Sequence, residues 1–465
     1  MKGLQLLFVS CLLTLGVAAK VTLPSVIDHH MVLQRETQVP LWGETRSHQK
    51  VTITTTWNNW VYTVKADAQG AWKVKVQTPK AGGPFQIHFN DGELLVLTDI
   101  LIGEVWVCAG QSNMEMPVQG FRNQPVLHSN EILLDADNGQ IRLFQLERAA
   151  SMKPQPNGKA VLWQESNAES VRGFSAVGYQ FAKILQEKLG VPIGIIGTYW
   201  GGTKIEAWMN RKSLQPFQDI SVPADTVGTG KNTPTALYNA MVHPLVGFGI
   251  RGMIWYQGEQ NRMNPHQYDQ LMLSMVNSWR NLWNQGEWPF YFVQIAPFGY
   301  KDKLGPAAPI REAQEKAARL LPNSGMVVSM DVGEEANIHP ANKTAISRRL
   351  AYWALAKTYH KKGIAFASPT FKSMEVKDNG TIAIKFDHAP LGLTSHGKAL
   401  SAFEVAGADQ QFYPAKARIT GDGVWVSSDQ VKKPVAVRYA YKDWVIGDLF
   451  NTSGLPVVPF RTDNW

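Results

Sequence analysis

Four short polar clusters in this sequence each follow an apolar run, and together they hold the groups that acyl transfer by a serine requires. That chemistry needs an exposed hydroxyl, a base that takes its proton, and N–H donors aimed at the oxyanion. We predict Ser112 as the nucleophile and His339 as the base. The clusters are GQSNM at 110–114, YWGGT at 199–203, YQGEQN at 256–261 and DVGEEANIHP at 331–340.

The same clusters supply the candidate oxyanion donors. A glycine lets the backbone approach a substrate carbonyl closely because it has no Cβ. Each residue taken alone is more often an ordinary cap or turn residue, so the catalytic interpretation depends on their joint occurrence. The predicted donors are the N–H of Ser112, an N–H of Gly201 or Gly202, and the side-chain amide of Asn261.

The apolar runs before the clusters predict the strands of a parallel sheet. VWVCAG, IGIIGTYW, GMIWYQG, FYFVQIA and MVVSMD are continuously apolar and alternate with helical stretches. We expect helices over 177–189, ending at Gly190, over 268–283, with Leu282 on the buried stripe, and after Pro340. The pattern predicts a doubly wound α/β domain, which brings the polar clusters together at the carboxyl ends of its strands.

Alternating apolar and polar residues predict β structure on both sides of this domain. VTITTTW, WVYTVKA, AWKVKV and FQIHF precede it, and an Asn-Gly turn within EVKDNGTIAIKF follows it, with ARITGDGVWVS and AVRYAY. We predict an N-terminal β domain over 20–100, the α/β domain over 101–365 and a C-terminal β region over 366–465. The two β regions form either one sandwich or two.

The first residues, MKGLQLLFVSCLLTLGVAAK, predict a secretory signal over 1–19. A Lys precedes an apolar run that ends in small residues, and the run is too short to span a membrane comfortably. We expect cleavage after Ala19, a periplasmic or secreted protein, and no membrane partner after cleavage. Cys108 is then the remaining thiol, and its apolar neighbours predict a buried side chain.

Charge and histidine spacing exclude two classes of ligand. A formal net charge of +8 is mild for 465 residues, and the Lys and Arg residues are scattered. Nucleic-acid binding would need a basic face with interleaved aromatic residues, and no such run occurs. His29, His30 and His243 lack the spacing of metal ligands, so we predict no metal site.

The four clusters resemble the blocks of the SGNH hydrolases, which are named for Ser, Gly, Asn and His. GQSNM resembles the sialate O-acetylesterase branch in particular, which shares its departure from the more familiar GDS form. The likeness covers nearly the whole chain after the signal. It is also carried by MVLQR at 31–35, WGGTKIEAW at 200–208, LYNAMVHPL at 237–245, IRGMIWYQGEQN at 250–261, IHPANK at 338–343 and GLPVVPFRTDNW at 454–465.

The resemblance implies a three-layer, flavodoxin-like hydrolase domain with a mainly parallel sheet and sandwich-like β regions at both ends. It implies an esterase that removes O-acetyl groups from sialic acid through an acetyl-enzyme, with no metal or organic cofactor. Gln111, Trp200 and Gln257 flank the predicted site, and we expect them to line the sugar pocket. Packing of Trp200 against the sheet is the alternative.

One position departs from the family pattern. Members of this branch often have an acid two residues before the histidine, where this chain has Asn337. An amide can orient an imidazole but cannot stabilise the imidazolium by charge. The residue that orients His339 is therefore Asn337 itself, one of Asp331, Glu334 and Glu335, or a backbone carbonyl in a dyad-like site.

Three other functions compete with the sialate esterase. A deacetylase of a plant polysaccharide such as acetylated xylan would share the serine cluster and differ in its pocket. A carbohydrate-binding protein would keep the scaffold without turnover, although the presence of both Ser112 and His339 argues against it. Glu115 and Glu259 would be the paired carboxylates of a glycoside hydrolase, but sequence spacing does not give their separation.

Overall fold

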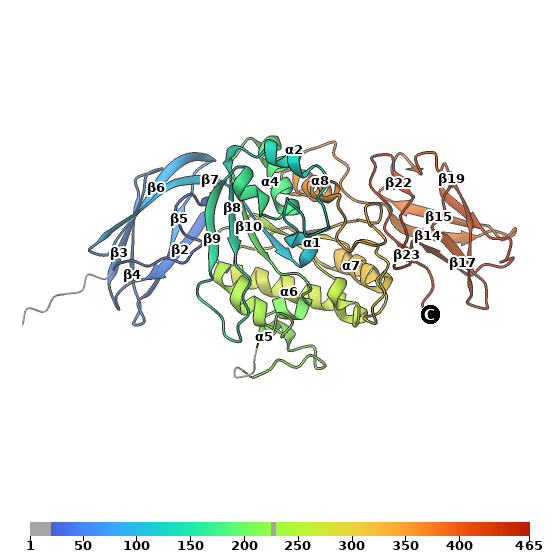
Figure 1. Ribbon diagram of the computed structural model, residues 1–465, viewed down its shortest axis with the longest axis horizontal. Coiled ribbons are helices and arrows are strands. Elements are labelled where there is room, and N and C mark those ends of the chain that lie inside the picture. Colours follow the sequence, from blue (N-terminus) through green and yellow to red (C-terminus); the bar gives the residue numbers. More distant parts are fainter. Residues whose placement is uncertain (1–19, 225–228) are drawn as a thin grey trace, which may run out of the picture.

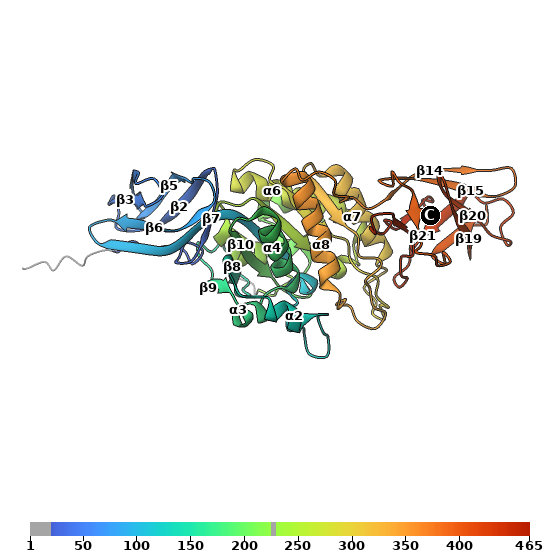
Figure 2. The same ribbon diagram turned by 90° about the horizontal axis from the view of Figure 1, so that it is seen from above.

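The computed structural model describes residues 20–224 and 229–465, so the predicted signal segment over 1–19 lies outside the described residues. Three parts follow one another along the long axis (Figure 1). The N-terminal strands lie at one end, helices and strands alternate in the middle, and the C-terminal strands lie at the opposite end. The two β regions therefore do not share one sandwich, as the second view also shows (Figure 2).

The middle part holds a large central sheet with the order β13-β12-β11-β7-β10-β8-β9. Neighbours from β13 to β8 are parallel, and β9 is antiparallel at the edge. Every residue of β10 and β11 is buried, as their apolar sequences predict. The predicted α/β architecture with a large central sheet is thus confirmed. The strands are β7 (Leu94–Gly110), β8 (Asn138–Leu146), β9 (Ala160–Ser166), β10 (Ile193–Tyr199), β11 (Gly252–Tyr256), β12 (Phe290–Val293) and β13 (Ser324–Val327).

Helices cover both faces of this sheet, with α4 and α8 packed together on one face and α6 and α7 on the other (Figure 1). Gly190, with a left-handed φ of 65°, ends α4 as predicted. The bounds predicted for α6 are confirmed, but Leu282 is 42% exposed because Trp279 and Trp283 occupy the core side of the last turns. The helices are α1 (Ser112–Glu115), α2 (Ser129–Leu134), α3 (Ala168–Arg172), α4 (Ala176–Leu189), α5 (Arg211–Leu214), α6 (Tyr268–Trp283), α7 (Ala308–Leu320) and α8 (Lys343–Trp353).

Short 3-10 and π turns complete the middle part. η1 follows the carboxyl end of β10, η4 and η5 follow that of β11, and η6 continues α8. They are η1 (Ile205–Trp208), η2 (Tyr238–Val242), η3 (His243–Leu245), η4 (Glu259–Asn261), η5 (Pro265–Gln267) and η6 (Ala354–Thr358).

Strand β7 belongs to two parts of the molecule. Its first half pairs with β6 in an antiparallel ladder, and its second half pairs with β10 and β11 in parallel. The strand has 17 residues and runs through residue 100, where the sequence predicts a domain boundary. The N-terminal strands are β1 (Val32–Gln34), β2 (Gln38–Glu44), β3 (Lys50–Thr55), β4 (Val61–Lys65), β5 (Ala71–Gln77) and β6 (Gly82–Asn90).

The C-terminal region consists of short antiparallel strands, and the predicted turn at Asn379 and Gly380 joins β14 to β15. Cys108 is buried in β7 as predicted, and burial raises the pKa of its thiol. No helix formed by the described residues has the length and apolar character needed to cross a membrane. The strands are β14 (Thr370–Val376), β15 (Ile382–Asp387), β16 (Leu393–Thr394), β17 (Phe403–Ala406), β18 (Phe412–Pro414), β19 (Lys416–Thr420), β20 (Gly423–Ser427), β21 (Ala436–Tyr439), β22 (Phe450–Asn451) and β23 (Phe460–Arg461).

Candidate active site

Ser112 is the first residue of α1, directly behind the carboxyl end of β7. Gly110 ends the strand with φ of 140°, and a Cβ there would lie 2.2 Å from the carbonyl oxygen of Tyr256. The backbone N–H of Gln111 donates to that same carbonyl at 2.9 Å. The turn therefore requires glycine at position 110, and its pairing with β11 presents a half-buried Ser112 at the edge of the sheet.

The glycines of the second cluster lie against the nucleophile. A Cβ on Gly201 would be 3.1 Å from the Cβ of Ser112, so the two backbones approach closely. The N–H of Gly201 already donates to the carboxylate of Glu115 at 2.8 Å. The N–H groups of Ser112 and Gly202 donate to no other described residue. Of the predicted backbone donors, Ser112 and Gly202 are therefore the two that are available to an oxyanion.

Asn261 lies in η4, just after β11, and is buried. Its Oδ1 accepts the backbone N–H of Ile205 at 2.9 Å, and its Nδ2 donates to the carboxylate of Glu206 at 2.8 Å. The second hydrogen of Nδ2 has no acceptor among the described residues. These bonds fix Asn261 to the chain that follows the second cluster. No hydrogen bond joins Asn261 to Ser112. The role of Asn261 as an oxyanion donor therefore stays a prediction.

His339 lies in the loop between β13 and α8, and its ring is held by the loop that follows α1. Nδ1 lies 2.5 Å from Oε1 of Gln124, and the ring of Phe121 packs edge-on at a centroid distance of 5.2 Å. Because an amide oxygen only accepts, Nδ1 carries the proton and Nε2 keeps its lone pair. The imidazole therefore has the tautomer that a general base needs.

The partner of the histidine ring differs from the candidates that the sequence suggests. Asn337 accepts the backbone N–H of His339 at 3.1 Å, and Asp331 pairs with Arg349 at 2.6 Å. Glu334 accepts the N–H of Ala341. None of these side chains bonds the imidazole.

The residue that does bond the ring, Gln124, lies 215 positions before His339 in the chain. Its segment GFRNQP has the composition of an ordinary loop, and no spacing or motif within it signals an active-site role. Sequence analysis therefore missed it.

A buried network ties the nucleophile turn to the histidine loop. Asn113 donates to Glu259 at 2.7 Å and to the carbonyl of Ile338 at 3.1 Å, and it accepts from the ammonium of Lys343 at 2.6 Å. Residues adjacent to Ser112 and His339 are thus bonded directly. No hydrogen bond joins the Ser112 hydroxyl to His339 among the described residues. Hydrogen bonds between catalytic groups commonly tighten only in the complex with substrate.

The same network sets the charge of the histidine. Burial and the positive charge of Lys343 lower the pKa of His339 to about 4. Burial lowers the pKa of Lys343 to about 7, against the opposing effect of Glu259 and Glu334. His339 is therefore neutral at pH 7 and ready to accept a proton.

The acid limb of kcat/KM for an aryl acetate is expected near pH 4, because the protonated imidazole cannot act as a base and His339 gains its proton only around that pH. Rates measured from about pH 3 to about pH 8 test this, with samples returned to neutral pH and reassayed to separate titration from unfolding. A limb near 6.5, the ordinary pKa of histidine, would contradict it.

The three residues predicted to line a sugar pocket differ in how far they are exposed. Gln111 accepts the N–H of Gly258, and Gln257 donates to the carbonyl of Thr203. Both side chains are buried and hydrogen-bond the backbone of neighbouring clusters, so they expose almost no surface to a sugar. Trp200 packs partly against the core and keeps some exposed surface.

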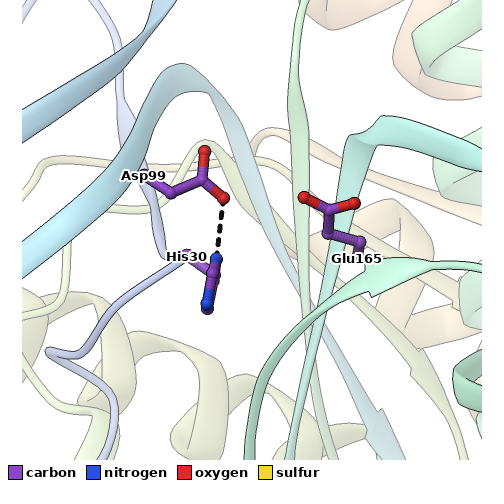
Figure 3. Close-up of side chains that lie close together, drawn as sticks. All are labelled: His30, Asp99 and Glu165. Atoms are coloured by element: carbon purple, nitrogen blue, oxygen red, sulfur yellow. Dashed lines mark hydrogen bonds and ion pairs between the residues drawn. The ribbon is translucent and has the colours of Figure 1, made fainter.

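One group of possible metal ligands comes together among the described residues: His30, Asp99 and Glu165. Figure 3 shows the imidazole of His30 bonded to Asp99, with Glu165 facing them. Arg142 places one guanidinium nitrogen 2.8 Å from a carboxylate oxygen of both acids. A protein cation thus already pairs with both acids of this group, and nothing further points to a metal ion there.

Comparison with known proteins agrees with this arrangement. The family model described as "Carbohydrate esterase, sialic acid-specific acetylesterase" matches residues 102–357. Human sialate O-acetylesterase is 30% identical over 392 residues, which cover 76% of this chain and 74% of that protein. The orangutan (Pongo abelii) enzyme of the same name is 28% identical and covers 94% of this chain and 91% of its own.

A solved structure resembles nearly the whole chain. A carbohydrate acetylesterase from Xanthomonas citri superimposes with a TM-score of 0.86 at 37% identity, covering 96% of this chain and 100% of that one. The matched family region includes all four polar clusters. We conclude that this chain is a carboxylic ester hydrolase acting on acetylated sugars and belongs to the carbohydrate esterase family of sialic acid-specific acetylesterases.

Proposed function

We propose that this chain is a serine esterase that removes O-acetyl groups from sialic acid through an acetyl-enzyme intermediate. The observation that carries the proposal is the close approach of Gly201 to Ser112, together with the N–H groups of Ser112 and Gly202, which donate to no other described residue. N–H groups without another acceptor are the donors that the oxygen of a tetrahedral intermediate requires. The base tautomer of His339 supports the same chemistry.

The proposed cycle has two halves. Nε2 of His339 takes the hydroxyl proton while Oγ of Ser112 attacks the acetyl carbonyl carbon, and the oxyanion accepts the free N–H groups. The bond from that carbon to the sugar oxygen then breaks, and the sugar oxygen receives the proton from His339. In the second half, water loses a proton to His339 and attacks the acetyl carbon. The bond from that carbon to Oγ of Ser112 then breaks, acetate leaves, and Oγ takes the proton back from His339.

The charge beside the site supports an anionic sugar. The ammonium of Lys231 donates to the carbonyl of Gly201 at 2.7 Å, and a Cβ on Gly202 would lie 3.0 Å from it. Arg148 pairs with Glu115 nearby and is more than half exposed. A cation next to the proposed oxyanion glycine can pair with the carboxylate of sialic acid. The names of the curated relatives support the same substrate.

Trapping of the intermediate tests the chemistry. Wild-type protein mixed with an aryl acetate and quenched in acid is expected to carry an acetyl group on the peptide that contains Ser112, found by mass spectrometry. Parallel assays use O-acetylated sialic acid and acetylated xylan. An acetyl group on another residue would refute the nucleophile, and deacetylation of xylan alone would refute the sialate substrate.

A neutral polysaccharide is the second candidate substrate, because the 37% identical relative is described only as a carbohydrate acetylesterase. Changing Lys231 to Met distinguishes the two. If sialic acid is the substrate, its KM rises about tenfold through the lost ion pair, while kcat/KM for an aryl acetate stays unchanged. Lys188→Met, on the exposed last turn of α4, is the matched control. Equal effects on both substrates would contradict a role in sialate binding.

We also propose that the chain acts outside the cytoplasm. This rests on the sequence of the first 19 residues, in which a Lys precedes an apolar run and two alanines. Amino-terminal sequencing of protein recovered from the periplasm or medium is expected to begin at Lys20.

A further inference from the structure

A cavity lies between the N-terminal strands β2 and β5 and two segments of the α/β part, and none of its lining residues belongs to the four polar clusters. Its volume is about 700 Å³. The α/β side is supplied by the residues around Asn157 and by η3, which begins at His243. His243 belongs to the LYNAMVHPL segment, to which the proposed ester chemistry gives no role.

Two tryptophans form the N-terminal wall. Trp42 on β2 is half-buried, and Trp72 on β5 is 3% exposed. Gly43 lies opposite Trp72 in the ladder, and a Cβ there would come within 2.9 Å of its ring, so the absence of a side chain makes room for the indole. The indole N–H of Trp72 is buried and has no hydrogen-bond partner among the described residues. Buried donors of this kind are normally satisfied by water or a ligand.

Oriented polar groups surround the aromatic wall. Oδ1 of Asn157 accepts the N–H and hydroxyl of Ser25, both at 2.9 Å, which leaves the amide hydrogens of Asn157 as donors. Nδ1 of His243 donates to the carbonyl of Gln155 at 2.9 Å, so its Nε2 is an acceptor. One carboxylate oxygen of Asp67 accepts two backbone N–H groups, and the other accepts no hydrogen bond from a described residue.

We propose that this cavity binds a neutral pyranose ring of a glycan, as a second sugar site distinct from the ester site at Ser112. An aromatic face with donors and acceptors fixed around it matches a sugar ring, which has apolar C–H faces and a rim of hydroxyls. The carboxylates of Glu44 and Asp67 can accept hydrogen bonds from sugar hydroxyls. Their two negative charges exceed the one positive charge of Lys73, so the lining disfavours an anionic sugar.

The cavity is connected to the ester site by one short segment. Arg148 bonds Glu115, whose carboxylate also holds the N–H of Gly201, and Asn157 lines the cavity nine residues later. Nine residues span at most about 30 Å. The binding site does not depend on which ester Ser112 attacks.

Calorimetry on the full-length protein tests the site with xylohexaose, cellohexaose and mannohexaose as neutral ligands and sialyllactose as the anionic one. At least one neutral ligand is expected to bind, and Trp42→Ala to weaken it by about tenfold or more. Trp60→Ala is the matched control, because Trp60 is on the same domain, is 56% exposed and lies outside the cavity lining. Hydrolysis of an aryl acetate is expected to be the same in both variants.

A second variant guards against a folding effect of the first. Asn157→Asp keeps the oxygen that accepts from Ser25 but removes the amide donor, and it is expected to weaken the neutral sugar by a similar factor. The proposal is overturned if none of the neutral ligands binds at about 10 mM, if sialyllactose binds more tightly than all of them, or if both variants bind like the wild type. Failure of the wild-type protein to hydrolyse an aryl acetate would contradict the proposed function. It would not affect the comparison of sugar binding between the variants.

Discussion

Changing Ser112 to Ala is expected to lower kcat/KM for an aryl acetate by about 10⁴-fold or more while the protein stays folded. The hydroxyl is the atom that attacks, and the N–H groups that remain give only weak catalysis by attracting the oxyanion. Little stability is lost, because Ser112 is only half-buried and its hydroxyl makes no hydrogen bond to another described residue. Steady-state kinetics and circular dichroism measure the two effects.

Ser129→Ala supplies the control for this change. Ser129 is also half-buried and is also the first residue of a short helix, α2, but it lies outside the four clusters. Its substitution is expected to leave kcat/KM unchanged. An Ser112→Ala enzyme that retains more than about a hundredth of the wild-type rate would show that another group is the nucleophile.

Changing Gln124 to Leu is expected to lower kcat by about 10²-fold or more with little change in KM. The amide oxygen is the partner of Nδ1, and without it the imidazole can turn or move its proton to the nitrogen that should act as base. Because an amide provides no negative charge, Gln124→Glu is expected to keep activity and to raise the pKa of His339, which moves the acid limb upward from about pH 4.

Asn337→Ala is the matched comparison for Gln124. Its side chain bonds the backbone of His339 rather than the ring, so its loss is expected to cost less than about tenfold in kcat. A larger loss than for Gln124→Leu would assign the orienting role to Asn337. An acid limb that stays in place in Gln124→Glu would show that Gln124 supports the loop without acting on the imidazole.

Local patterns in the sequence were sufficient to predict the elements that carry the site. Burial imposes a pattern of apolar residues on the sequence, and that pattern can be recognised. It appears as continuous apolar runs in β10 and β11 and as apolar stripes in α4 and α6. The four polar clusters then follow the ends of parallel strands, so their convergence at one edge of the sheet is a consequence of topology.

Contacts between distant loops could not be predicted in this way. The bond between Gln124 and His339 depends on how two irregular segments meet, and neither has a period or a motif that specifies its partner. The same holds for Glu115, which engages the N–H of Gly201 and so selects Gly202 as the available donor. His30, Asp99 and Glu165 likewise gather from separate segments, with Arg142 between the two acids.

Strand β7 is shared by the N-terminal strands and the central sheet, and this limits where the protein can be truncated. Its first half is hydrogen-bonded to the N-terminal strand β6, and its second half leads directly to the turn of Ser112. A protein cut near residue 100 would lose half of this strand and expose an unpaired edge, which invites aggregation. The N-terminal strands therefore cannot be removed without damage to the α/β part. Truncated or chimeric versions of this enzyme have to keep the two parts together.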